Sequence, residues 1–258
     1  MSARDFLIRG LLAGLLAGLA AFAVAYVVGE PSVRAAIAIE AAGDEQADHG
    51  HVHAGTAEPA AADEVPRSLR STAGLLTGIL VGGVTFGGLV GVLSALALGR
   101  LGRLGIRATT LTMAGIGFVA IYAVPFLAYP PNPPGVGRAE TIGYRSAVYF
   151  LMTAISLIAA ITVIMVGRRM ARRWGAWHAG LAAVGGYLVV TLVAMALMPG
   201  VNEVPDGFPA PLLFNFRIAS FATQLTLWGV LGVALAELGH RLVRSRQPEA
   251  RALVDTSA

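Results

Sequence analysis

The sequence predicts an all-α fold: a polytopic integral membrane helix bundle of about six transmembrane helices, with residues 1–258 forming one transmembrane domain. Two observations lead to this prediction. Hydrophobic residues make up 56% of the 258 residues and charged residues only 13%, whereas soluble domains carry roughly 25% charged residues. The charges also fall in blocks, which leave six windows free of Asp, Glu and Arg: 10–29, 71–99, 108–137, 146–167, 174–202 and 218–236.

Each window is long enough, or nearly so, to cross a membrane, because about 20 apolar helical residues span the ~30 Å hydrocarbon core. We therefore expect helices near 7–28, 73–98, 108–128, 145–166, 177–198 and 214–236. The first segment has an alternative interpretation as a cleaved signal peptide, since Arg4 and Arg9 begin it and Ala21-Phe22-Ala23 resembles a cleavage site. Its apolar stretch continues to Val28, beyond the usual ~7–15 residues, which favours a retained helix.

The distribution of arginine predicts the orientation. If the amino terminus is cytoplasmic, 13 of the 19 arginines lie on the inner side and 11 of the 15 acids on the outer side. Positive charge is enriched in cytoplasmic loops, so both chain ends are expected in the cytoplasm, with 241–258 as a cytoplasmic tail. The basic residues then lie at the membrane face and do not form a nucleic-acid footprint, because no basic stripe alternates with exposed aromatic residues.

Composition also excludes several chemistries. The chain has no cysteine and no lysine, which excludes thiolate metal sites, Schiff bases and an intact phosphate-binding P-loop. No nucleophile elbow, paired-acid motif or His-Glu-x-x-His motif is present, so we expect no enzyme activity and no permanently bound cofactor. His178 lies beside the interfacial Trp174 and Trp177 and His240 lies in a basic segment, and neither is expected to bind a ligand.

Glycines at four-residue steps predict close packing of the first two helices. They are Gly10, Gly14 and Gly18 in the first helix, and Gly74, Gly78, Gly82, Gly83, Gly87 and Gly91 in the second. This spacing puts small residues on one helical face, where backbones can approach. Tight packing is the favoured interpretation, and a sliding surface in a transport cycle is the alternative. The windows contain no charged residues that would mark a proton pathway.

An acidic stretch in the first outer loop is the strongest candidate metal site. From Glu40 to Glu64 it holds seven acids, no bases and three histidines, in the core Asp48-His49-Gly50-His51-Val52-His53. Imidazole suits zinc, nickel, copper and cobalt, and a chain without core-forming residues is expected to be flexible. We therefore predict that 40–66 is a flexible outer loop in which His49, His51, His53 and Asp48 capture a metal ion. Incidental low complexity is the alternative.

Three segments rich in proline and glycine bring oxygen donors to the outer surface. Gly29-Glu30-Pro31 is expected to close the first helix, and the other two run over 129–135 and 202–209. If these segments converge, the oxygens form a mouth suited to a divalent cation; the candidates are Glu30, Asn132, Asn202, Glu203 and Asp206. Simple turn chemistry is the alternative, since Pro205-Asp206-Gly207 is a good β-turn by itself.

Taken together, these segments resemble the CbtA type of predicted cobalt transporter subunits. The resemblance rests on GLLAGLLAGLAAFAVAYVVGEP in the first helix, the acidic histidine-containing loop, GLLTGILVGGVTFGGLVGVLSALALGRLG, GFVAIYAVPFLAYPPNPPGVG, YFLMTAISL and VNEVPDGFPAPLLFNFRIASFATQLTLWG. It implies a multi-pass protein of the bacterial inner membrane that functions in cobalt uptake associated with cobalamin synthesis. It also implies a small one-helix companion subunit with its own histidines. The family is often described with five helices.

Two functions remain open at this stage. In the first, the chain is the membrane subunit of a divalent-metal uptake system, with cobalt favoured. It would collect the ion at the outer loop, hand it to the outer mouth and pass it across the bilayer between helices, by movement or with a partner. The companion subunit is the expected partner, and a homo-oligomer is possible. In the second, it is a scaffold or assembly factor that transports nothing and whose outer loop binds a partner protein.

Overall fold

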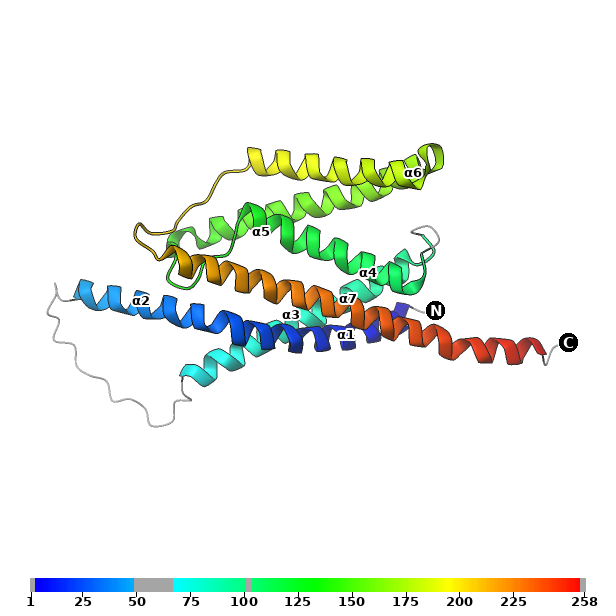
Figure 1. Ribbon diagram of the computed structural model, residues 1–258, viewed down its shortest axis with the longest axis horizontal. Coiled ribbons are helices and arrows are strands. Elements are labelled where there is room, and N and C mark those ends of the chain that lie inside the picture. Colours follow the sequence, from blue (N-terminus) through cyan, green and yellow to red (C-terminus); the bar gives the residue numbers. More distant parts are fainter. Residues whose placement is uncertain (1–2, 49–66, 101–103, 256–258) are drawn as a thin grey trace. The chain divides into compact units, whose positions relative to one another are not determined.

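The computed structural model describes residues 3–48, 67–100 and 104–255 (Figure 1). These residues form helices, turns and loops, and none of them lies in a strand. Five helices among them are long and apolar enough to cross a membrane: Ala3–Ala42, Thr72–Ala97, Ile106–Ala128, Ala139–Leu197 and Ala210–Arg241. The prediction of an all-α fold is therefore confirmed for the described residues, and the five helices are compatible with the predicted membrane bundle. The count is five where we expected six, because the fourth helix covers both 145–166 and 177–198.

Two proline-containing runs stay helical through short π-helical segments. Helix α1 (Ala3–Val24) continues through η1 (Ala25–Gly29) into α2 (Glu30–Asp48). Helix α4 (Ile106–Gly117) likewise continues through η2 (Phe118–Ala123) into α5 (Val124–Ala128).

The expectation that Gly29-Glu30-Pro31 closes the first helix is wrong. Proline lacks an N–H and its ring collides with the carbonyl four residues back in an α-helix. Directly before Pro31, however, the N–H of Glu30 bonds to the oxygen of Ala25, five residues back. This wider turn lets the helix pass the proline. The same wider π-helical turn precedes Pro125, where the N–H of Val124 bonds to the oxygen of Val119.

Helices also occupy parts of the segments expected as loop and tail. Residues 40–48 of the predicted outer loop are the end of α2, while 49–66 lie outside the described residues. Helix α7 (Ala210–Asp255) continues through most of the predicted tail. The remaining elements are α3 (Arg67–Ala97), the 3-10 turn η3 (Ala139–Thr141) and α6 (Ile142–Leu197).

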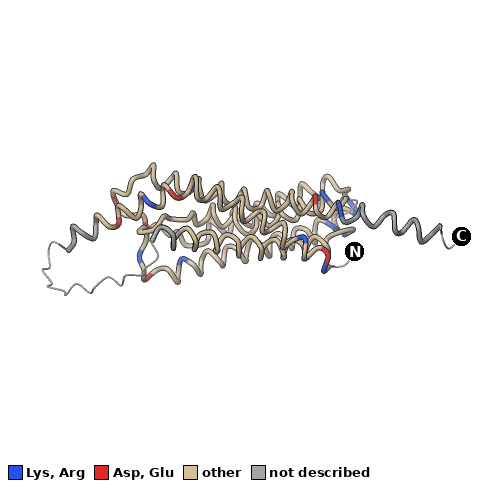
Figure 2. The backbone as a smooth tube through the Cα atoms, turned by 90° about the horizontal axis from the view of Figure 1, so that it is seen from below, with Lys and Arg blue, Asp and Glu red and all other residues tan. Residues whose placement is uncertain are grey.

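The chain divides into two compact units. The first consists of Met1–Ala114, Pro133–Gly135 and Pro209–Ala258, and the second of Gly115–Asn132 and Val136–Phe208. Charged residues gather at the ends of the long apolar stretches and leave the stretches themselves uncharged (Figure 2). Large apolar side chains are exposed on these stretches, among them Leu12 (51%) and Ile158 (64%). Such outward-facing apolar surface is what a helix presents to lipid.

Glycine holds α1 and α3 in direct backbone contact in the first unit. A Cβ atom added to Gly87 would collide with the backbone oxygen of Gly10, and one added to Gly83 would lie 2.6 Å from the oxygen of Gly14. The predicted packing through Gly10, Gly14, Gly18, Gly83, Gly87 and Gly91 is thus confirmed. The other three glycines of α3 differ, since a Cβ atom on Gly74, Gly78 or Gly82 would meet nothing within 4 Å.

One end of the first unit brings three helices together. A Cβ atom on Gly239 of α7 would lie 3.5 Å from Ile106 at the start of α4 and 3.8 Å from the fully buried Phe6 of α1. Nearby, Glu237 pairs with Arg107 at 2.7 Å and with Arg241 at 3.2 Å. The amino-terminal end of α1 therefore lies at the same end of this unit as the 237–241 segment of α7.

Helix α6 doubles back on itself in the second unit. It has 56 residues and is interrupted at Gly175, which has φ 79° and ψ 160°, a conformation that glycine adopts readily. The two arms contact each other, since the hydroxyls of Ser156 and Tyr187 lie 2.7 Å apart. The expected helices at 145–166 and 177–198 are therefore the two arms of this hairpin.

Candidate functional site

The predicted metal ligands of the outer loop fall at the edge of the described structure. Asp48 is the last residue of α2, and His49, His51 and His53 lie outside the described residues. Within residues 3–42, 72–100 and 104–241, whose side chains the structure describes, no three His, Asp or Glu side chains lie close enough to hold a metal ion. Metal capture by the histidine tract stays a prediction.

The predicted outer mouth draws on both units. Glu30 belongs to the first unit, where it pairs with Arg34 one helical turn away at 3.1 Å. The other four candidates, Asn132, Asn202, Glu203 and Asp206, belong to the second unit. Convergence of all five into one mouth stays a prediction.

Turn chemistry accounts for two of these candidates. The N–H of Phe208 donates to the oxygen of Pro205 at 3.1 Å, and Gly207 between them has φ 86°. This geometry is a β-turn with glycine at the position that requires positive φ, so Asp206 is exposed at a turn. The side-chain oxygen of Asn202 accepts a 3.4 Å bond from the N–H of Val204.

Glu203 is the centre of the most elaborate polar cluster in the second unit. One of its carboxylate oxygens accepts a hydrogen bond from the hydroxyl of Thr141 at 2.8 Å and one from the N–H of Arg138 at 3.0 Å. The same oxygen lies 3.5 Å from Nε of Arg145. The carboxylate side chain is only 10% exposed. These contacts fasten the 198–209 loop to the beginning of α6.

The partners of Glu203 favour its ionised form. The hydroxyl of Thr141 first, then the N–H of Arg138 and the charge of Arg145, hold the pKa of the Glu203 carboxyl below its usual range. A carboxylate is stabilised when donors and a cation surround it. Glu203 therefore already has a cation beside it, and a metal ion at this oxygen would have to displace Arg145.

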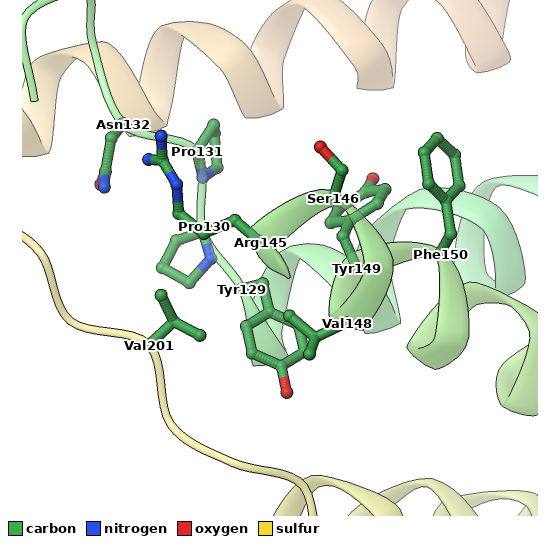
Figure 3. Close-up of a pocket in the computed structure, with 10 residues that line it drawn as sticks. All are labelled: Tyr129, Pro130, Pro131, Asn132, Arg145, Ser146, Val148, Tyr149, Phe150 and Val201. Carbon is green, nitrogen blue, oxygen red and sulfur yellow. The ribbon is translucent and has the colours of Figure 1, made fainter. Parts of the chain in front are cut away.

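A second tie joins the same loop to the end of α5. The phenol of Tyr129 donates a 2.9 Å hydrogen bond to the backbone oxygen of Pro199. A cavity of about 300 Å³ lies between the Glu203 cluster and the hydrogen bond of Tyr129 to Pro199 (Figure 3). Its volume is at the lower end of the size range of ligand pockets. It is lined by Tyr129, Pro130, Pro131, Asn132, Arg145, Ser146, Val148, Tyr149, Phe150 and Val201. Asn132 is the member of the predicted mouth that reaches it.

Comparison with known proteins identifies the family. The sequence model of one family, described as "Probable cobalt transporter subunit (CbtA)", matches residues 3–240. The chain belongs to the CbtA family. No curated protein and no solved structure was found to match it.

Membership of the CbtA family and the five membrane-length helices together identify a multi-pass membrane protein of cobalt transport. The match runs from the start of α1 to the last turns of the apolar part of α7, so it covers both compact units. A transporter subunit family also agrees with the expectation of a protein that is not an enzyme, and it makes cobalt a transported substrate.

Sequence reasoning missed the arginine of this cluster, although a signal was present. Arg145 immediately precedes the uncharged window 146–167, and Glu203 immediately follows the window 174–202. Two consecutive helices that form a hairpin return the chain to the same end, so the two charges flanking the pair are expected to meet. The contributions of Thr141 and Tyr129 have no comparable signal, because hydroxyl and phenol groups are common at helix ends.

Proposed function

We propose that this chain is the membrane-spanning subunit of a cobalt uptake system. The observation that carries the proposal is the CbtA family match over residues 3–240, together with the five helices of membrane length. In this proposal the two arms of α6 cross the bilayer separately, which gives six crossings. Both chain ends then lie in the cytoplasm of a bacterial inner membrane, in agreement with the arginine distribution.

Metal capture is assigned to the outer histidine tract. His49, His51 and His53 alternate along the chain directly after Asp48, so two or three imidazoles can reach one ion. Neutral imidazole is a good ligand for cobalt, nickel and zinc. Helix α2 supports this role because it delivers the chain to the start of the tract at Asp48.

Passage of the ion requires more than this chain. The uncharged windows hold no carboxylate that could ligate a cation inside the bilayer, and the sequence has no intact nucleotide-binding loop to supply energy. We therefore propose that the subunit works as a homo-oligomer or with a small histidine-containing companion of one helix. The oxygen donors Glu30, Asn132, Asn202, Glu203 and Asp206 are the proposed receiving groups at the outer surface.

Cellular metal content tests the proposal. Cells that lack other cobalt uptake receive the wild type, a His49/His51/His53→Ala variant, or empty vector, each with and without the companion. Cobalt, nickel and zinc are supplied together and measured by mass spectrometry. A His178→Ala/His240→Ala variant is the matched control, because both histidines lie outside the loop.

We expect selective cobalt accumulation with the wild type and the control variant, and a reduced level with the triple variant. Unchanged accumulation in the triple variant would remove the loop from the transport path. If the wild type matches empty vector for every metal under all conditions, the transport function is wrong and the scaffold function takes its place.

A further inference from the structure

The cavity between the proline-rich turn and α6 has a chemistry opposite to that of a metal site. Of its ten lining residues, Arg145 alone is charged, and none is an acid or a histidine. The other polar side chains that line it are Asn132, Ser146, Tyr129 and Tyr149 (Figure 3). A divalent cation here would face a guanidinium without a carboxylate on the wall, so the cavity suits an anion.

The guanidinium of Arg145 is held in place before any ligand binds. Gly137 has φ 112°, and a Cβ atom there would collide with Nη1 of Arg145, so the absence of a side chain at this glycine leaves room for the guanidinium. Its Nη2 lies 3.5 Å from the backbone oxygen of Arg138. A side chain that is already positioned loses little freedom when a ligand arrives.

Glu203 pairs with Arg145 without a hydrogen bond to its Nε. The contact between Nε and the carboxylate is a 3.5 Å ion pair, and this buried Nε makes no hydrogen bond. The same carboxylate oxygen already accepts bonds from Thr141 and from the N–H of Arg138. Hydrogen-bonding capacity therefore remains on the guanidinium, whose planar fork matches the oxygens of a phosphate group.

The opposite wall of the cavity is apolar and faces the surface. Phe150, which lines it, is 69% exposed and lies in the helix Ala139–Leu197, which is long and apolar enough to cross a membrane. Tyr129 and Tyr149 line the same cavity, and aromatic residues of this kind are typical of the membrane–water interface. A ligand here meets a cation at one side and hydrocarbon-like surface at the other.

We propose that this cavity binds a phosphate group, with Arg145 as the recognising cation, and that an anionic phospholipid headgroup supplies it. The proposal uses none of the histidines assigned to metal capture. It does place an anion at the cavity that Asn132 lines and beside the partner of Glu203, so with the anion bound these two residues do not receive the metal. Free inorganic phosphate offers the same chemistry, and the two sources are separated experimentally.

The test uses the full chain purified in detergent and followed by thermal unfolding. One arm adds inorganic phosphate against chloride at equal ionic strength. The other adds phosphatidylglycerol against diacylglycerol, which has the same acyl chains without a phosphate. We expect phosphatidylglycerol, but not diacylglycerol, to raise the unfolding temperature of the wild type, and native mass spectrometry to detect the bound lipid. An equal rise with inorganic phosphate would assign the site to the free anion and overturn the assignment to lipid.

Two charge variants separate binding from the structural role of Arg145. Arg145→Gln is expected to weaken phosphatidylglycerol binding at least tenfold. Glu203→Gln breaks the same ion pair but keeps the cation, so it is expected to retain or tighten binding. Val201→Trp, which fills the cavity without touching the charges, is expected to abolish binding and covers the case in which Arg145→Gln does not fold. Equal stabilisation by diacylglycerol, or equal loss of binding in both charge variants, would overturn the proposal.

Discussion

The contact between α1 and α3 makes a strong prediction for the substitution Gly87→Ala. The added Cβ atom would collide with the oxygen of Gly10, and it would lie 2.7 Å from Cα and 2.9 Å from N of Gly14. Non-bonded carbon atoms prefer about 3.5–4.0 Å. Relief of these contacts therefore requires the two helices to separate by about 1 Å, which also loosens the neighbouring glycine contacts.

Overpacking of this kind costs about 1–3 kcal/mol. Alanine also improves helix propensity by about 1 kcal/mol, and a control is needed to remove that gain. Gly78→Ala is the matched control, because it lies in the same helix and a Cβ atom there would meet nothing within 4 Å. Gly87→Ala is thus expected to be about 1–3 kcal/mol less stable than Gly78→Ala.

The assay is thermal unfolding of the two variants in the same detergent, followed by circular dichroism. At about 2–4 °C per kcal/mol for a chain of this size, the midpoint of Gly87→Ala should lie roughly 5 °C below that of Gly78→Ala. Equal midpoints would show that the backbones of α1 and α3 are not in contact, and the packing argument would be refuted.

Three further substitutions test the loop ties and the charged end of the first unit. Folding lowers the pKa of Glu203, so its stabilisation is complete above the usual carboxyl range and is lost as pH falls through the lowered pKa. Glu203→Gln should therefore be less stable than wild type at pH 7, and this deficit should shrink as pH falls through the acid range; a deficit that does not change with pH would contradict this. Tyr129→Phe removes the bond to Pro199 and should lower the unfolding free energy by about 0.5–1.5 kcal/mol in denaturant titration, whereas no loss would mean that the bond does not form. Arg107→Gln removes an exposed pair with Glu237 and should produce a small loss of thermal stability that disappears in 1 M salt, while a loss independent of salt would indicate a packing role.

Much of the fold was predictable from where charges are absent. Each window free of Asp, Glu and Arg overlaps an apolar helix or one arm of α6, because lipid tolerates few charged groups. Glycine spacing also predicted the α1–α3 contact, since Gly10 and Gly87 carry no side chains to separate the backbones. These inferences succeed because they depend on repeated features of composition, so single exceptions do not disturb them.

Local exceptions were not predictable in the same way. The sequence predicts that Gly29-Glu30-Pro31 closes the first helix, yet the π-helical turn at Ala25–Gly29 carries the helix past Pro31. Glu203 is a second exception. The sequence predicts it as an oxygen donor for a metal, whereas in the structure its carboxylate is paired with Arg145 and accepts two hydrogen bonds. Its contacts with Thr141, Arg138 and Arg145 depend on how the α6 hairpin folds back at Gly175. The charges that flank the two arms of the hairpin gave a sequence signal for the pairing of Arg145 with Glu203, whereas the contacts with Thr141 and with the N–H of Arg138 have no such signal.

The continuous helix through η1 also has an electrostatic consequence. Glu30 is the first charged residue after the window 10–29, and α2 extends from there to Asp48, a rise of about 27 Å at 1.5 Å per residue. This is more than three Debye lengths in physiological salt, where one is about 8 Å. Charges at the two ends of α2 are therefore screened from each other. An ion attracted to the far end is not drawn onward by the field at Glu30, so any transfer between them must occur by diffusion or by movement of the chain.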